Sequence, residues 1–459
     1  MQSVSEWAQL NFAGCDLGDK RRTKRLVQVA EQIGSNPSAS LPNQIEHWGD
    51  LKAAYRLFDC EEVTFEAIAG PHWQLTKQAA SGRCLVIGDT TEFNFGKHRE
   101  IADIGPTGNG SGQGFLLHNA LLVSADSQEI LGVAGQTIHY RKKKKSKKRE
   151  NSAQMLKRDR ESEMWGTVID QIGKPQNDVE YVHVFDRGAD NFEVYCRLLQ
   201  NDGQWVIRAS KMNRTVLTDA GQQMPLKEYL PQLKTWGHYT LSLRARPGQA
   251  AREAQIEVRV GRINIPRPRH VSPWVRSLKQ PPIAMNVIEV VEVDVPPGVT
   301  PIRWVLFTSL PIETFADVWA AIGYYEMRWL VEEYHKALKT GCATESRQLK
   351  AADRLEAFVG LTSVVAIRLL QLKSLARTNP EVPAQRVVPR IWLEMLKLAR
   401  PRLNRVHDLT VGQFYREVAK LGGFLGRKSD GEPGWITIWR GWEKLNTYVF
   451  VASKLKLKI

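Results

Sequence analysis

Apolar positions recur at helical spacing over the first 65 residues of the chain. The clearest stretch follows Asp19, whose side chain can cap a helix that Gly34 and Pro37 would end. One face of this helix carries the apolar residues Leu26, Val29, Ala30 and Ile33. A second helix is predicted over residues 50–58, so the chain should begin with a helical region.

The pattern changes to strand-like runs from residue 83 onward. Apolar runs at residues 84–95, 114–125 and 129–140 predict three consecutive strands, with a turn near residues 126–127. Two further runs end at Phe185 and Ala209, and a helical stretch lies between them. This alternation of strands and helices predicts an α/β fold.

Residues 212–310 interrupt this rhythm with alternating apolar and polar positions, separated by Pro and Gly. They predict a mainly β insertion, which ends in a run that contains Trp304. From Phe315 onward the spacing is helical again, with strong apolar stripes at residues 351–374 and 409–421. We therefore expect a helical C-terminal region, which the Gly-rich segment after Leu421 interrupts. Its apolar residues are expected to form an exposed surface for a partner, or else to pack on the chain's own catalytic domain; they are Phe414, Val418, Leu421, Trp439 and Trp442.

The charge balance predicts a polyanionic partner. The chain has 459 residues and holds 64 Lys and Arg against 49 Asp and Glu, a net charge of +15. Neutralisation of phosphates dominates nucleic-acid affinity, so such a surplus favours nucleic acid. We find no run of about 18 apolar residues and no amphipathic basic terminus, and therefore expect no membrane partner. The lysine-rich segment Lys142–Lys148 is expected to be a basic loop, either disordered or laid on phosphates.

The cysteines argue against disulfides and structural zinc. The five are scattered, without CxxC spacing: Cys15, Cys60, Cys84, Cys196 and Cys342. This pattern is typical of a reducing compartment, so we expect a cytoplasmic protein.

Residues 325–339, YEMRWLVEEYHKALK, carry the most specific pattern of the chain. Drawn as one helix, the segment has an apolar face and an opposite face with one carboxylate, a tyrosine and several cations. That polar face consists of Tyr325, Arg328, Glu332, Lys336 and Lys339. It suits a site that handles a metal ion and phosphates together, although a solvated face with i,i+4 ion pairs gives the same pattern.

Two further carboxylates follow apolar strand runs. Asp89 comes after CLVIG, and Asp186 comes after VEYVHVF. The carboxyl ends of parallel strands converge on one crevice, so Asp89, Asp186 and Glu332 could share one or two divalent ions. Taken singly, each Asp could equally end a strand in a turn or cap a helix.

The spacing Tyr-x2-Arg-x3-Glu-x6-Lys, filled by Tyr325, Arg328, Glu332 and Lys339, resembles the signature of cut-and-paste DNA transposases of the insertion-sequence-four family. The flanking HKALKTG, the DTT at Asp89 and the VFDRGAD at Asp186 also match. The similarity runs in the same order from GDKRRTKRLV to LGGFLGRKSDG. It therefore covers nearly the whole chain.

This resemblance implies an α/β, ribonuclease-H-like catalytic core with a mixed sheet over residues 66–375, with the β-rich insertion at 212–310. Asp89, Asp186 and Glu332 would be the catalytic residues and would hold Mg²⁺, with two ions to a site and Mn²⁺ as a substitute. Residues 1–65 would recognise the transposon ends, and residues 376–459 would pair two protomers. The partners would be double-stranded DNA, at the ends and at the target, and a second copy in a nucleoid-associated bacterial complex.

The resemblance also implies DNA contacts. Tyr325, Arg328 and Lys339 would grip phosphates around the cut, and Trp304 would stack on a flipped base. Arg208 and Lys211 would contact the same DNA. Independently of the resemblance, Arg21, Arg22 and Arg25 crowd the first turns of the helix after Asp19, where they could clamp DNA or form a solvated basic surface.

Two other classes of function remain open. An inactive remnant could bind DNA as a regulator, and a metal-dependent nuclease could cut DNA without strand transfer. Metal-dependent cleavage would exclude the first class, and joining of a cut end to a second duplex would exclude the second.

Overall fold

The computed structural model describes residues 3–97, 100–142, 160–176, 178–243, 245, 250–427 and 430–455. Residues 143–148, which make up most of the predicted lysine loop, lie outside this part of the chain.

The chain begins with helices, as the apolar spacing predicts. They are α1 (Val4–Phe12), α2 (Lys20–Ser35), α3 (Leu41–Gln44), α4 (Trp48–Phe58) and α5 (Phe65–Gln78). The Asp19 side chain accepts a hydrogen bond from the Arg21 backbone N–H and so caps α2. The predicted stripe at residues 26, 29, 30 and 33 is buried, which confirms the apolar face of this helix.

The described strands form one twelve-stranded mixed sheet. The strands are β1 (Arg83–Asn94), β2 (Gly105–Thr107), β3 (Gly112–Ser124), β4 (Ile130–His139), β5 (Glu180–Phe185), β6 (Gln204–Arg208), β7 (Thr215–Thr218), β8 (Gln223–Pro225), β9 (Lys234–Leu243), β10 (Arg252–Ile265), β11 (Ile283–Val293) and β12 (Arg303–Thr308). The strand runs predicted from the sequence are confirmed, whereas short strands such as β2 were not predicted.

The order of the strands brings the core and the insertion into the same sheet. β4, β3, β1, β5 and β6 lie side by side, and β12, β11 and β10 continue from β6. The pairs β1–β5 and β5–β6 are parallel, whereas β3 runs antiparallel to β1 and β12 antiparallel to β6. The β-rich insertion therefore extends the core sheet and does not form a sheet of its own.

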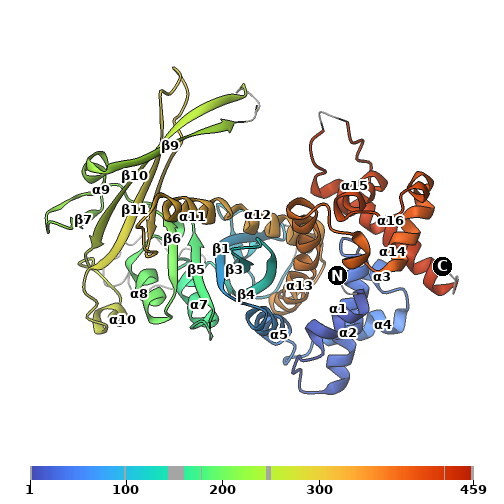
Figure 1. Ribbon diagram of the computed structural model, residues 1–459. Helices are drawn as coiled ribbons and strands as arrows, with labels where there is room; N and C mark the ends of the chain where they lie inside the picture. Colours follow the sequence, from blue (N-terminus) through green and yellow to red (C-terminus); the bar gives the residue numbers. More distant parts are fainter. Residues whose placement is uncertain are drawn as a thin grey trace.

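Helices cover both faces of the core part of the sheet. On one side lie α7 (Glu163–Ile172) and α8 (Phe192–Gln200), and on the other α11 (Phe315–Glu326), α12 (Trp329–Lys336) and α13 (Ala352–Thr378). Short helices α9 (Leu226–Tyr229) and α10 (Pro273–Ser277) lie within the insertion. In Figure 1, α11 and α12 cross the sheet on the side opposite α7 and α8.

Helix α13 corrects one expectation from the sequence. It contains an 18-residue window with a mean hydropathy of 1.6, long and apolar enough to span a membrane, and 89% of that window is buried inside the protein. A run of this kind does exist, contrary to the sequence analysis. Because most of this window is buried inside the protein, α13 is a core helix of the fold.

The C-terminal helices pack beside the N-terminal ones. They are α14 (Arg390–Ala399), α15 (Val411–Leu421) and α16 (Trp435–Lys454), and Figure 1 shows them with α1–α4 at one end of the molecule, opposite the β9–β11 ribbon. Gly422 and Gly441 let α15 and α16 approach closely, since a Cβ at Gly441 would lie 1.7 Å from the Val418 carbonyl oxygen.

The aromatic residues of this region also correct an expectation. An exposed apolar surface around residues 414–442 would suit a partner. Instead, Phe414, Val418, Trp439 and Trp442 are buried in the chain's own core. The exposed apolar side chains of α16 are others, namely Ile436, Tyr448, Phe450 and Val451, and Leu455 directly after the helix is exposed as well.

Candidate active site

Asp89 in β1 and Asp186, directly after the parallel strand β5, come at corresponding positions. The register of β1 and β5 runs from Arg83–Glu180 to Ile87–Val184, and two more residues along each chain bring Asp89 beside Asp186. Asp186 directly follows β5, as predicted, and its Oδ1 accepts a hydrogen bond of 2.7 Å from the Gly188 N–H. Asp89 does not end its strand: β1 continues to Asn94 against β3. It lies where the parallel pairing with β5 stops.

Strand alternation indicates that both aspartates lie on the face of the sheet that α12 covers, and for Asp89 the ion pair with Arg328 agrees. Side chains alternate along a strand, so Asp89 shares its face with Ile87, and Asp186 shares its face with Val184. These two apolar residues belong to the same core cluster as Val331 of α12. The fold therefore brings the two aspartates and the helix of Glu332 to one place.

The segment 325–339 is not one helix, which corrects the sequence analysis. Helix α11 ends at Glu326, α12 begins at Trp329, and a π-helical turn, η3, follows from Ala337 to Gly341. The apolar face is nevertheless buried at Val331, Tyr334, Ala337 and Leu338. Glu332 is exposed, whereas Tyr325, placed on the polar face by the helical drawing, is a buried residue of α11.

Arg328, in the break between α11 and α12, contacts both Asp89 and Glu332. Its guanidinium donates to Asp89 Oδ2 at 3.1 Å and also forms an ion pair with Glu332. The pKa of Asp89 is raised to about 6, mainly by burial and also by the charges of Asp186 and Glu332, while the Thr90 N–H and Arg328 act in the opposite direction. Asp89 therefore sits among like charges that Arg328 only partly neutralises.

The donor chemistry of these residues suits a hard divalent cation, which takes carboxylate oxygens. Within the described residues, however, no three His, Cys, Asp or Glu side chains converge closely enough to hold an ion. Arg328 lies between Asp89 and Glu332. The three carboxylates fit a metal by chemistry and by position on the fold, and Arg328 would have to shift for all three to converge.

Cationic and aromatic residues surround the same face. An open hollow of about 360 Å³ lies at Glu332 and is lined by Glu332, His335, Lys336, Lys339, Thr340 and Glu345. Lys339 Nζ donates to the Glu92 carbonyl at 2.8 Å and pairs with Glu345 at 3.1 Å. Glu345 was missed by the sequence analysis, since no local pattern marks it.

Trp304 and Arg208 lie further along this face. In β12 and β6, Leu306 pairs with Arg208, and Leu306 belongs to the core cluster under α12. Trp304 is half-buried, and its ring meets the Tyr325 ring edge-on at 5.5 Å. Arg208 donates to the Arg303 carbonyl at 3.1 Å, and Lys211 is exposed just beyond β6. All of them lie on the side that the carboxylates face or on its rim.

The three N-terminal arginines lie apart from this site. Arg21 is exposed and pairs with Asp19 at 3.0 Å, Arg22 pairs with Glu62 at 2.8 Å, and Arg25 pairs with Asp50 at 2.6 Å. Exposed ion pairs of this kind are weak, so phosphates can replace the carboxylates.

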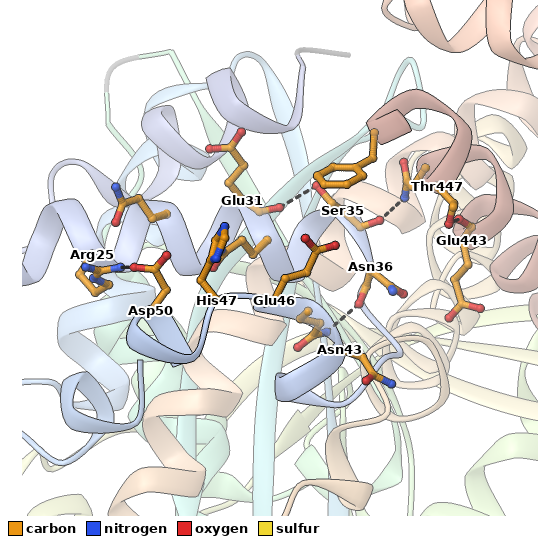
Figure 2. A pocket seen from close by; sticks show the side chains of 15 residues that line it. Arg25, Glu31, Ser35, Asn36, Asn43, Glu46, His47, Asp50, Glu443 and Thr447 are labelled. Carbon is orange, nitrogen blue, oxygen red and sulfur yellow. Dashed lines mark hydrogen bonds and ion pairs between the residues drawn. The ribbon is translucent and has the colours of Figure 1, made fainter. Parts of the chain in front are cut away.

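Arg25 also borders a polar cavity of about 590 Å³ between α2, residues 36–50 and α16. Figure 2 shows Glu31, Glu46, Asp50 and Glu443 around it. The acidic lining contains none of Asp89, Asp186 and Glu332. This cavity is therefore separate from the candidate active site.

Two family models match the ends of the chain. Residues 4–63 match the model described as transposase DNA-binding, and residues 364–456 match the transposase Tn5 dimerisation domain. Together these two matches indicate a Tn5-type transposase. Arg21, Arg22 and Arg25 lie in the first matched region, and α14, α15 and α16 lie in the second.

These matches support DNA binding and homodimer formation by this transposase. Asp89, Asp186 and Glu332 lie between the two matched regions. Their assignment therefore depends on the geometry of the sheet and α12.

Proposed function

We propose that this transposase excises and reinserts a mobile element by metal-dependent phosphoryl transfer at Asp89, Asp186 and Glu332. The observation that carries the proposal is the matched register of Asp89 and Asp186, with Glu332 joined to Asp89 through Arg328. Three antiparallel strands followed by two parallel ones support a ribonuclease-H-like core. The proposed sites of action are the terminal inverted repeats of the element and a target duplex in the bacterial cytoplasm.

The three carboxylates would hold Mg²⁺, or Mn²⁺ in its place, with two ions to a site. Bound Mg²⁺ makes an attacking oxygen more nucleophilic and stabilises the charge on the leaving oxygen. The reaction sequence is a nick that frees a 3′-hydroxyl, attack of that hydroxyl on the opposite strand to give a hairpin, hairpin opening by water, and attack on target DNA. Each step is an in-line displacement at phosphorus, so one site serves all four.

The protein's cations position the phosphates. Arg328 would leave its two carboxylates and contact the phosphate beside the cut, because a phosphate offers its guanidinium a bidentate partner. Lys339 would exchange Glu345 for a second phosphate. Each exchange replaces one charged partner with another.

Trp304 would stabilise the hairpin step. A tight hairpin forces a base out of the stack, which costs a few kcal/mol. Stacking on an aromatic ring returns about 1–3 kcal/mol per base. The half-buried ring of Trp304 lies on the face that holds the carboxylates, so it can receive that base.

The direct test is an assay with labelled DNA that carries the inverted repeats from either side of the gene. Incubation with Mg²⁺ and a second duplex should give nicked, hairpin and joined products in that order. Cutting without joining would favour a nuclease. Binding without cutting would favour a DNA-binding regulator.

A further inference from the structure

Glu333 follows Glu332 in α12, but it is buried where Glu332 is exposed. Its carboxylate accepts hydrogen bonds from Trp435 Nε1 at 2.8 Å, from Lys336 Nζ at 3.0 Å, and from Lys373 Nζ. Only Lys336 belongs to α12. Lys373 lies in α13 and Trp435 begins α16, and both fall within the matched dimerisation region.

Glu333, Lys373 and Trp435 form a buried cluster. The side chain of Lys373 is 5% exposed, and its ammonium lies 4.0 Å from the centroid of the Trp435 ring. A buried ammonium requires a charged partner, and Glu333 provides it. The buried Trp435 N–H also needs an acceptor, and Glu333 is that acceptor. The packed positions of α13 and α16 are therefore those in which Lys373 and Trp435 both reach the Glu333 carboxylate.

A second contact fixes the turn that follows α12. Trp439 stacks on Trp435 with ring centroids 5.6 Å apart and covers Gly341, the last residue of η3. A Cβ at Gly341 would lie 1.8 Å from the Trp439 ring, so only glycine permits this approach. The same turn carries Lys339. Helix α16 therefore touches both the helix of Glu332 and the turn of Lys339.

We propose that Glu333 is a positioning residue through which the dimerisation region sets the position of Glu332. Lys373 and Trp435 hold Glu333 from one side of α12 and so hold the adjacent Glu332 toward Asp89. A second copy can bind to the exposed face of α16, which includes Tyr448 and Val451. Binding there would shift α16, and Trp435 of the same helix donates to Glu333. The inference rests on the catalytic role proposed for Glu332.

The test uses Trp435→Phe in the full-length protein. This change keeps an aromatic ring beside Lys373 and removes the N–H that Glu333 accepts, together with part of the indole ring; Glu333→Gln, which leaves the indole in place, is the companion variant. Loss of a hydrogen bond to a charged group should speed amide hydrogen exchange of residues 329–336 about tenfold, measured by mass spectrometry without metal or DNA. Cleavage by preformed paired-end complexes should slow by a similar factor.

Glu417 offers a matched control in the same region. It is also a buried carboxylate with three cationic partners, Arg400 at 3.1 Å, Arg402 at 2.7 Å and Lys420 at 2.8 Å, and none of these residues belongs to α12. Glu417→Gln should lower the melting temperature without changing exchange in residues 329–336 or the cleavage rate of paired-end complexes.

Unchanged exchange of α12 in both Trp435→Phe and Glu333→Gln would overturn the inference. Equal acceleration by Glu417→Gln would do so as well, since the effect would then be general loosening. The exchange measurement needs no catalysis. Retained cleavage in Glu332→Gln would therefore refute the proposed function separately from the coupling through Glu333.

Discussion

Asp89 lies beside Asp186 because β1 and β5 run parallel, and both residues come two positions after the last paired residues, Ile87 and Val184. Parallel strands are about 4.8 Å apart, so two carboxylates on the same face at this position repel each other unless cations neutralise them. Arg328 supplies one such charge. The local structure thus concentrates negative charge where the proposed chemistry requires cations.

Trp304→Ala should leave the first nick nearly unchanged and slow hairpin formation about tenfold or more. The nick needs no extruded base, whereas the hairpin loses about 1–3 kcal/mol of stacking. Denaturing gels of end-labelled DNA would show nicked product accumulating, and Trp304→Phe should behave close to wild type. An equal loss in both steps would show that Trp304 acts through its packing on Tyr325.

Replacing Arg21, Arg22 and Arg25 with Gln should weaken binding to specific ends and flatten its salt dependence. Each lost phosphate contact lowers the log–log slope by roughly 0.9. Filter binding at several salt concentrations gives the slope. Asp50→Asn is the control for Arg25, because it breaks the same ion pair without removing the cation. An unchanged slope in the triple variant would place end recognition elsewhere.

Tyr448→Ser, Val451→Ser and Leu455→Ser together should abolish paired-end complexes and leave single-end binding intact. These side chains, on α16 and directly after it, are 41%, 47% and 65% exposed, so their removal costs the folded monomer little. Native gels separate the two complexes. Paired-end complexes that persist would place the dimer contact outside this face. Deletion of α15 and α16 is not a useful alternative, because Phe414 and Trp442 are core residues.

Acid should destabilise the fold through His72. Burial lowers the pKa of His72 to about 4, and its ring joins α5 to Asn11 of α1 and to the Val133 N–H of β4. The unfolded chain takes up a proton near the ordinary value of about 6.5. The folding stability associated with neutral His72 is therefore complete above that pH and is lost as pH falls toward 4.

Thermal unfolding between pH 7 and 4.5 measures this effect. His72→Gln should lower the melting temperature at pH 7 and reduce its decrease with acid, whereas exposed His407→Gln should change neither. A decrease with acid as steep in His72→Gln as in wild type would contradict this role.

The sequence predicted what local spacing determines. The cap at Asp19, the buried stripe of α2 and the strands before Asp89 and Asp186 follow from residues within a few positions of one another. The break at Met327 could not be predicted, because the apolar spacing continues through it. The fate of Trp439 and Trp442 was predicted wrongly, since periodicity shows that a face is apolar and not which surface covers it.

The rest of the site depends on contacts between distant residues. Arg328 reaches Asp89 across 239 positions, and Trp435 reaches Glu333 across 102. Only the topology of the sheet and the packing of α16 bring these residues together. No local signal could therefore have identified Glu333 as more than a neighbour of Glu332.

The most direct test of the account is the cleavage rate of Asp89→Asn, Asp186→Asn and Glu332→Gln in preformed paired-end complexes with Mg²⁺. Each variant keeps the shape of its side chain and loses the charge that would hold a cation. The account predicts that all three form complexes with DNA at wild-type affinity and cut at least about a thousandfold more slowly. Cleavage within tenfold of wild type by any one of them would contradict it.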